Sequence, residues 1–459
     1  MKTINLIIII IISFLVVSCS DLLDKSPISS FSADGFYKTT SDAQTGVYGI
    51  YDAAQTAFRL NFAYWGEGRG DNVKTAQSGE GLALMQNNLD ASLGSAYWGD
   101  LYNIINRANY AIKYIPNVYK EGDAAGNQLI AEAKALRALA YFYLVRVWGD
   151  IPVITEPYLS IDQNIFVSKT DKESVLNLIE DDLKFAAQNC KDKFGDNRDR
   201  IMFTKGSVNA LLTQVYMWRH KYDDALTTSK LVLDNTLYSL VTTMDDWGKI
   251  FSTGYSKESI FEVAYSDKET NSLRVLYAIG SYAIYTPSEK FKTSFETGDK
   301  RIDYVYDVTL ADPKAIWKYL GKGISDEVAT ASKQDIVLIR LADIMLLRAE
   351  ALTKKGGTQN IADALILLNK IRTRAGLTAF NSEADAIAAY GDLESAILHE
   401  RSIELCFEGH RWFDLVRTGK AISTMKPLNG LSDEKNLVWP ISTTSLQKNP
   451  NLLQNEYYK

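Results

Sequence analysis

The stretch between Ala131 and Val147 constrains the fold more than any other part of the chain. Apolar residues recur three and four positions apart on two faces of this stretch, one formed by Leu136, Leu139, Tyr143 and Val147 and the other by Ala131, Ala135, Ala138 and Phe142. This periodicity predicts a helix that is apolar almost all round, and neighbours bury such a helix on several sides. Gly149 and Pro152 end it. The stretch therefore predicts the central helix of an all-α core.

Other segments predict helices that would pack around this one. Periodic apolar residues mark helices near residues 40–54, 96–115 and 174–190. Leu212–Val232 and Leu341–Ala375 each match the tetratricopeptide pattern of a helix, a short turn and a second helix, and the central helix with its 104–115 partner offers a third pair. Because one pair buries little alone, stacked pairs must share a core. We therefore expect a helical-repeat scaffold over about residues 36–240 and 336–420.

Between these two parts, residues 241–335 lose their helical periodicity and are rich in aromatic residues. Long irregular segments in a compact protein are usually functional loops. We expect this segment to face a ligand, helix to resume at Ile336, and the tail Asn436–Lys459 to be extended and turn structure on the surface.

The N-terminus has the features of an export signal. Lys2 precedes an apolar run from Leu6 to Val17 that is too short to span a bilayer comfortably, and small residues then lead to Cys19. This order resembles a bacterial lipobox, in which the Cys is lipidated and becomes the first residue. The alternative is an ordinary signal peptide that contains a Cys. We expect a lipoprotein signal over residues 1–18, a single domain over residues 19–459 and a lipid on Cys19 that anchors the body to a membrane.

Composition and cysteine content narrow the function further. A formal net charge of −6 and a pI near 5.4 argue against nucleic acid as a partner, because phosphate binding needs a basic surface. Cys190 and Cys406 lie far apart in sequence without a disulfide framework, so buried free thiols are expected. The chain has no G-x-S-x-G motif and no phosphate-binding loop.

Two groups of residues are candidates for binding a ligand. The glycine-rich polar loop at residues 66–81 follows Trp65 and contains Arg69, Asp71 and Asn72, an aromatic face beside planar hydrogen-bonding groups that suits sugar rings. An equally good interpretation is that Trp65 packs on the body and the loop is a solvated turn. The irregular segment contributes the second group, Tyr277, Tyr282, Tyr285, Trp317 and Tyr319. Trp98 lies in register with apolar helix positions and is expected in the core.

Glu400, Glu404 and Glu408 recur four residues apart and have two interpretations. Paired carboxylates hydrolyse glycosides when they face each other across a cleft. Carboxylates stacked on one helix, here with Arg401, Arg411 and Arg417 nearby, more often form a structural salt-bridge network. With only three histidines in the chain, a metal site is hard to assemble, and we expect no metal and no cofactor.

Several of these segments together resemble the SusD/RagB family of surface lipoproteins. The resemblance rests on AEAKALRALAYFYLVRVWGDIPVITEP, IRLADIMLLRAEAL with LNKIRTRAG, HERSIELCFEGHRWFDLVRTG and the closing NPNLLQNEYY, which occur in the family's order. It implies an all-α fold of tetratricopeptide-like helix pairs in a right-handed superhelical scaffold, with a loop-rich irregular segment packed on it. It also implies no catalysis, a place on the cell surface at the outer membrane, and a SusC-like TonB-dependent transporter as partner.

The resemblance implies capture of an oligosaccharide or polysaccharide, which we take as the leading hypothesis. The alternatives are a RagB-type peptide-binding protein, a glycan hydrolase, and an interaction scaffold without a small ligand. The candidate ligand-binding residues are Trp65, Arg69, Asp71, Asn72, Tyr277, Tyr282, Trp317 and Tyr319. The resemblance does not fix which ligand binds, because family members diverge most in the middle segment.

Overall fold

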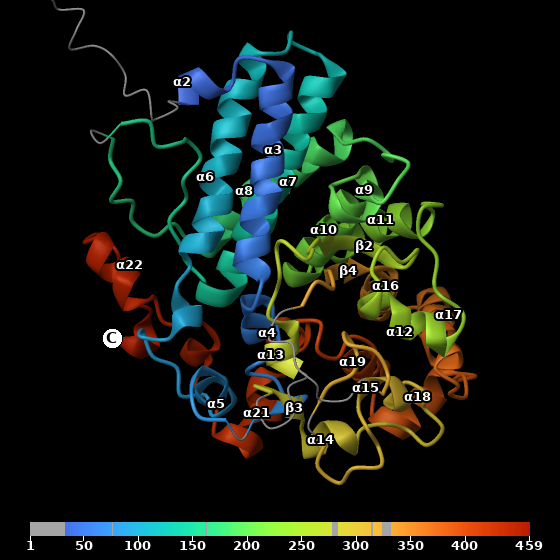
Figure 1. Ribbon diagram of the computed structural model, residues 1–459. Coiled ribbons are helices and arrows are strands. Elements are labelled where there is room, and N and C mark those ends of the chain that lie inside the picture. The colour runs from blue at the N-terminus through green and yellow to red at the C-terminus, as the bar shows by residue number, and fades with distance from the viewer. Residues whose placement is uncertain (1–32, 76, 161–162, 278–282, 314, 324–331) are drawn as a thin grey trace, which may run out of the picture.

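The computed structural model describes residues 33–459 except residues 76, 161–162, 278–282, 314 and 324–331 (Figure 1). The signal sequence, Cys19 and Tyr282 therefore lie outside the described residues. Helices dominate the rest, and the strands are few and short. The predicted all-α class is confirmed. Within the described part of the chain, no helix has the length and apolar character needed to cross a bilayer.

The predicted central helix is α7 (Ala124–Trp148). The Asp123 side chain accepts hydrogen bonds from the first-turn N–H groups of Ala125 and Gly126, and Gly149 ends the helix with a positive φ of 74°. Every residue between Ala131 and Gly149 is buried except Lys134. α6 (Gly99–Tyr114) and α8 (Lys172–Asn189) pack against α7, and α3 (Thr40–Phe58) packs against α6 and α7.

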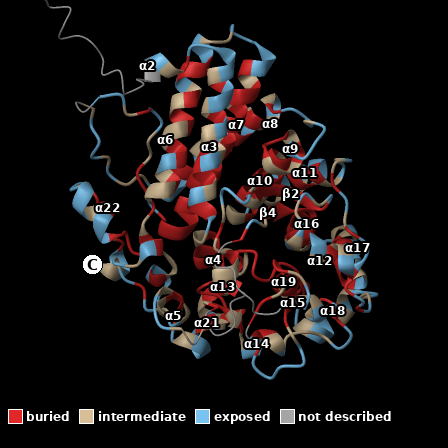
Figure 2. Cartoon of the chain, viewed as in Figure 1, coloured by how far each residue is buried: buried red, intermediate tan, exposed pale blue. Residues whose placement is uncertain are grey.

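The remaining scaffold consists of two helix pairs that stack on this bundle. The first pair is α10 (Lys205–Trp218) with α11 (Tyr222–Leu233), and the second is α16 (Leu341–Lys355) with α17 (Thr358–Arg374). α8 contacts α10, and α11 contacts α16 although more than a hundred residues separate them in sequence. The predicted tetratricopeptide-like pairs are therefore present and share one continuous core, as the burial colouring in Figure 2 shows.

The segment between the two scaffold parts consists of short elements: α12 (Met244–Ser252), β2 (Ser259–Val263), α13 (Leu273–Tyr277), β3 (Thr286–Pro287), α14 (Glu289–Lys292) and α15 (Ile302–Val305). β2 pairs antiparallel with β4 (Ile336–Arg340), and both strands are buried at all five positions. The expected start of helix at Ile336 is therefore wrong, because the helix begins at Leu341. A short apolar run does not distinguish a buried strand from a buried helix.

The C-terminal part packs beneath the scaffold. It contains α18 (Glu383–Tyr390), α19 (Leu393–Glu404), α20 (Arg411–Arg417), α21 (Ala421–Asn429) and α22 (Thr443–Lys448), with 3₁₀ turns η5 (Glu434–Leu437) and η6 (Glu456–Tyr458). The expected surface tail is wrong in part, because Trp439 and Ile441 are fully buried. The tail docks on the end of α7, where the N–H of Trp439 donates to the Val147 carbonyl at 2.8 Å.

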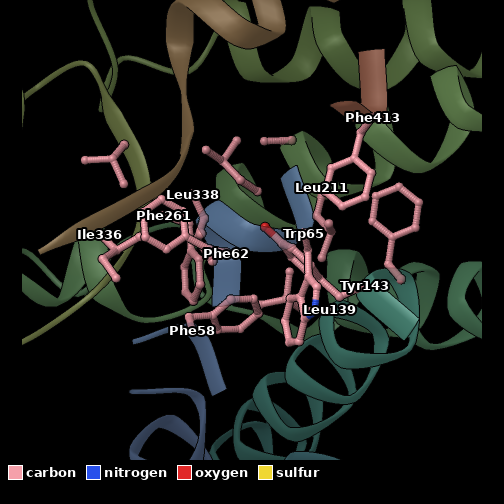
Figure 3. Close-up of a cluster of buried hydrophobic side chains, with 14 of the residues drawn as sticks. Phe58, Phe62, Trp65, Leu139, Tyr143, Leu211, Phe261, Ile336, Leu338 and Phe413 are labelled. Carbon is pink, nitrogen blue, oxygen red and sulfur yellow. The ribbon is translucent and has the colours of Figure 1, made fainter. Parts of the chain in front are cut away.

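The remaining short elements are α2 (Ala33–Phe36), α4 (Asn61–Gly66), β1 (Val73–Lys74), α5 (Glu80–Met85), η2 (Gly94–Ala96), η3 (Ile115–Asn117) and α9 (Arg198–Ile201). α4 follows α3 into the core, where its Phe62 and Trp65 lie among side chains of α3 and α7 such as Phe58 and Tyr143 (Figure 3). α4 thus brings the glycine-rich loop into the interior. β1 then pairs antiparallel with β3.

Candidate functional site

Two adjoining cavities lie where the N-terminal loop meets the C-terminal helices. Cavity A, of about 190 Å³, and cavity B, of about 530 Å³, share Asp71 and Lys290, so we treat them as one Asp71 groove. Cavity A is lined by Asp71, Asn72, Lys290, Phe291, Ser294, Ser395, Leu398, His399, Ser402, Arg411, Leu415, Lys420 and Thr424. Cavity B is lined by Gly70, Asp71, Val73, Lys74, Met85, Gln86, Ser288, Glu289, Lys290, Met425, Leu428 and Asn429.

Asp71 is held at the centre of the groove by two cations. Arg411 donates from Nε to Oδ1 at 2.7 Å and from Nη2 to Oδ2 at 3.1 Å, and Lys290 Nζ lies 2.7 Å from Oδ2. Burial alone raises the pKa of the Asp71 carboxyl, but Arg411 and Lys290 outweigh it and hold that pKa well below its usual range. The carboxylate is therefore ionised at neutral pH, and the bidentate arginine fixes its orientation.

Polar groups of several kinds line cavity A. Lys420 Nζ donates to Ser395 Oγ at 2.9 Å, and Asn72 Nδ2 donates to the Ser402 carbonyl at 3.3 Å. Burial, as the main cause, lowers the pKa of His399 to about 4, so its imidazole is neutral at pH 7 and has one donor and one acceptor nitrogen. The cavity thus offers cations, hydroxyls and a neutral ring in a small volume.

Cavity B is less polar than cavity A. Its apolar lining residues are Val73, Met85, Met425 and Leu428. Lys74 pairs with Glu289 at 2.9 Å and with Asp312 at 3.0 Å, so the charges at its rim are balanced. Leu428 is 51% exposed and Gln86 is also exposed, so a ligand can reach an apolar contact and an amide side by side.

Two predicted ligand residues lie in the core instead of the groove. Trp65 is fully buried and donates its indole N–H to the Ser95 carbonyl at 3.0 Å, with the rings of Tyr143 and Trp148 packed around it. Arg69 is also buried. Its guanidinium donates to the main-chain carbonyls of residues 436 and 437 and lies 4.2 Å from the Trp412 ring centre. The prediction that Trp65 and Arg69 present surfaces to a sugar does not fit this burial.

The aromatic residues of the irregular segment are mostly in the core as well. Tyr277 and Tyr319 are fully buried and stack on each other at 6.0 Å, and Tyr277 donates its hydroxyl to the Phe407 carbonyl. Tyr285 is also fully buried. A stacking role for these three tyrosines does not fit the structure, because their rings already fill the space between the segment and the scaffold. Trp317 is half-buried and lines neither cavity of the groove.

Trp98 is buried as expected, with ring contacts to Tyr102 and Trp148. Cys190 and Cys406 are buried free thiols, which confirms that prediction. Of the eight predicted ligand residues, Asp71 and Asn72 lie in the groove. Sequence reasoning did not select the groove's other polar residues, since Lys290, His399 and Lys420 come from separate segments and carry no motif.

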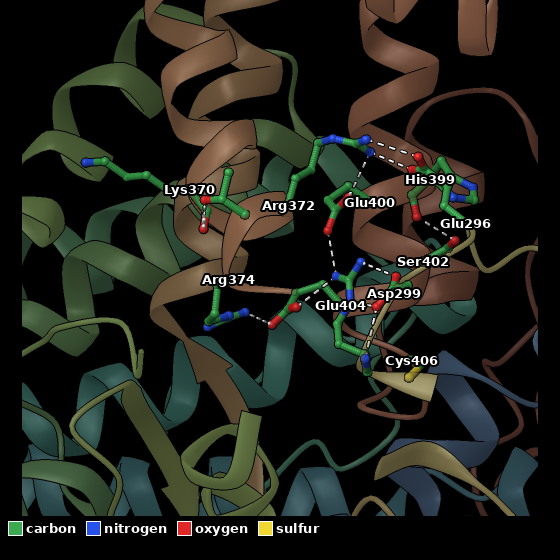
Figure 4. A network of polar contacts seen from close by, with 12 residues as sticks. Glu296, Asp299, Lys370, Arg372, Arg374, His399, Glu400, Ser402, Glu404 and Cys406 are labelled. Carbon is green, nitrogen blue, oxygen red and sulfur yellow. Dashed lines mark hydrogen bonds and ion pairs between the residues drawn. The ribbon is translucent and has the colours of Figure 1, made fainter. Parts of the chain in front are cut away.

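The three spaced glutamates form a buried structural network, as predicted. Glu400 pairs with Arg301 at 2.5 Å, and Glu404 pairs with Arg374 at 2.5 Å; Figure 4 shows Glu400, Glu404 and Arg374. Glu404 also pairs with Arg340 at 2.6 Å, and Glu408 pairs with Lys318 at 2.5 Å. The three arginines nearby in sequence pair with other carboxylates: Arg401 with Asp343 and Asp414, Arg411 with Asp71, and Arg417 with Glu350. None of the three glutamates lines the groove.

The pKa values of the network's glutamates shift in different directions, because burial raises that of Glu400, whereas at Glu408 the cations Arg340 and Lys318 outweigh burial and lower it. Burial raises the pKa of Glu404, but Arg374, Arg340 and Arg301 outweigh burial and hold that pKa well below its usual range. In the described part of the chain, no group of three or more His, Cys, Asp or Glu side chains is placed to hold a metal ion.

Comparison with known proteins now places the chain in a family. A SusD-like protein of Formosa agariphila is 32% identical over 100% of this chain and 99% of its own length. The chain belongs to the SusD family. The SusD family matches at residues 314–458, and the family described as "Starch-binding associating with outer membrane" matches at residues 21–217.

Two further relatives are named for the glycan that they bind. The starch-binding protein SusD of Bacteroides thetaiotaomicron is 34% identical over 30% of this chain and 24% of its own length. A solved laminarin-binding SusD-like protein is 26% identical, and the match covers 92% of this chain and 100% of that one with a TM-score of 0.78. These relatives confirm the resemblance that the sequence motifs carried.

Proposed function

We propose that this SusD-family chain is a lipid-anchored, cell-surface protein that captures an oligosaccharide or polysaccharide in the Asp71 groove. The observation that carries the proposal is that cavities A and B adjoin at Asp71 and Lys290, so a polar half and a partly apolar half form one site. Sugars present hydroxyls beside apolar C–H faces, and a groove with both kinds of lining suits them. Relatives named for starch and laminarin binding support this ligand class.

The captured glycan passes, in this proposal, to a SusC-like TonB-dependent transporter in the outer membrane. The support is family membership together with the lipobox-like sequence before Cys19 and the outer-membrane wording of the family that matches residues 21–217. Co-purification tests this partnership directly. Membranes solubilised in mild detergent should yield the transporter with an affinity-tagged copy of this chain, and a tagged chain recovered alone would contradict it.

Titration calorimetry against a polysaccharide panel tests binding. We expect a dissociation constant on the order of micromolar to millimolar, since hydrated flexible sugars bury little area per ring. Gln86→Ala and Leu428→Ala remove exposed lining of cavity B and should weaken binding about three- to tenfold at an unchanged melting temperature. Leu453→Ala, which is 68% exposed and outside the groove, is the matched control. Unchanged affinity in both cavity B variants would place the site elsewhere.

The alternatives have distinct outcomes in the same assays. A peptide-binding protein would give a heat of binding with a peptide library and none with polysaccharides. A hydrolase would release reducing ends that Glu400→Gln or Glu404→Gln abolishes, but both carboxylates are buried in ion pairs, and we expect no release. A scaffold without a small ligand would bind neither panel.

A further inference from the structure

The charges that line cavity A do not balance. Lys290, Arg411 and Lys420 contribute three positive charges, and Asp71 is the sole carboxylate among the described lining residues. His399 adds none, because its pKa of about 4 leaves it neutral at pH 7. The cavity therefore has an excess of two positive charges in a chain whose formal net charge is −6.

Among the described residues, direct hydrogen bonds and ion pairs do not neutralise this excess. Asp71 engages Arg411 through Nε and Nη2, which leaves Nη1 without a hydrogen bond to any described residue. Lys420 Nζ donates to the Ser395 hydroxyl and forms no ion pair with a described carboxylate within 4 Å. The nearby Asp392 carboxylate lies outside the lining and accepts the Ser395 N–H as the N-cap of α19.

The arrangement of these groups suits an oxyanion. Asp71 fixes Arg411 through Nε and Nη2, while Nη1 donates to no described residue. Lys420 lies at the N-cap of α21, and both side chains line the same small cavity. Arginine and lysine together bind carboxylate or sulfate oxygens through charge-assisted hydrogen bonds, and low-dielectric walls strengthen that attraction. The hydroxyls of Ser395 and Thr424 also line the cavity and can donate further hydrogen bonds to an anion, whereas those of Ser294 and Ser402 already donate to the carbonyls of residues 291 and 399.

We propose that cavity A recognises an anionic substituent, a uronate carboxylate or a sulfate ester, on the captured glycan, while the neutral cavity B contacts adjoining sugar rings. This inference rests on the proposed glycan-binding function and names the ligand's chemical class. It predicts acidic polysaccharides, and not neutral ones, as the tight ligands.

Calorimetry with chemically paired polysaccharides tests this specificity. The probes are polygalacturonate with its carboxyl-reduced form, carrageenan with its desulfated form, and neutral starch and laminarin. We expect at least one acidic probe to bind, and its neutralised form to bind at least about tenfold more weakly. The pair that responds distinguishes uronate from sulfate. Raising the salt concentration should weaken binding of the acidic probe, because ions screen the attraction between its anionic groups and the cations of cavity A.

Variants assign the effect to cavity A. Lys420→Met should weaken binding of the acidic probe roughly tenfold, and Lys420→Arg should keep most of the affinity because it keeps the charge. The control is Lys120→Met, at an exposed lysine outside the groove, which should leave the affinity unchanged. Thermal melts of each variant check that the fold is kept. If the tightest ligand is neutral and Lys420→Met leaves it unchanged, the inference is wrong while the proposed function stands. If no polysaccharide binds, or only acidic peptides such as polyglutamate bind, both are wrong.

Discussion

Gly66 lies so close to Gly409 that no side chain fits between them: a Cβ on Gly66 would stand 1.9 Å from the Gly409 carbonyl oxygen. This contact joins the end of α4 to the turn that follows α19, two segments that lie far apart in the sequence. The backbone of the glycine-rich loop thereby packs directly on the backbone of the C-terminal part, next to the segment that carries Arg411.

Gly66→Ala should destabilise the protein by about 2–4 kcal/mol, because the methyl group meets rigid backbone that has to shift. Urea denaturation measures the change. Gly49→Ala is the matched control in a helix, since its Cβ would meet only Arg107 Nη1 at 3.7 Å, and alanine favours a helix over glycine. Equal stability of both variants would show that the close contact in the structure is wrong.

Trp65→Ala should unfold the protein more readily instead of selectively losing ligand. The side chain is fully buried and its indole N–H is hydrogen-bonded, so truncation should cost about 3–5 kcal/mol. Thermal melts beside calorimetry measure both quantities. A Trp65→Ala protein with a wild-type melting temperature and no glycan binding would restore the stacking role that its burial argues against.

Stability should fall with rising pH through Glu67. Burial, as the main cause, raises the pKa of this carboxyl from 4.5 to about 8, and its Oε2 has no hydrogen-bond partner in the described structure. The stabilisation is complete below pH 4.5, where both states hold the proton, and is lost as pH rises through 8, because the unfolded chain ionises first.

Glu67→Gln removes this titration and should abolish a stability loss on the order of 2–4 kcal/mol between pH 5 and pH 9. The measurement is the difference in unfolding free energy between the two pH values, so other titrating groups cancel between wild type and variant. Glu121→Gln, at an exposed position, is the control. An identical pH dependence in wild type and Glu67→Gln would show that Glu67 is ionised in the fold.

Cys19→Ala should release the protein from the membrane, because the lipobox-like sequence ends at this residue. Fractionation should find the wild type in the detergent phase and accessible to protease on intact cells, and the variant in the soluble fraction. Wild-type protein free in the periplasm would contradict both the lipid anchor and the proposed surface role.

The sequence predicted those parts of the fold whose signal is local. The periodicity around Leu136 and Leu139 is complete within a few turns, and the predicted helix is present as α7. The strand Ile336–Arg340 was missed because its run of four apolar residues fits a buried strand and a buried helix equally well.

The glycine-rich loop was misjudged because its partners are remote. Arg69 looks like a solvated charge in its local sequence, yet its hydrogen-bond acceptors at residues 436 and 437 are more than 360 positions away. Tyr277 and Tyr319 were expected on a ligand surface because irregular segments often bind, but they fill the gap under that segment. Asp71 and Asn72 lie in the groove, and whether they touch a glycan stays a prediction.

The ion pair between Asp71 and Arg411 joins residues 340 positions apart, which matters for how the protein folds during synthesis. Synthesis proceeds from the N-terminus, so the acidic half of this pair exists long before its cationic partner leaves the ribosome. A nascent or truncated chain that stops before Arg411 therefore lacks one side of the groove, including Lys420 and Leu428. We therefore expect a chain truncated before Arg411 to lack the proposed glycan binding.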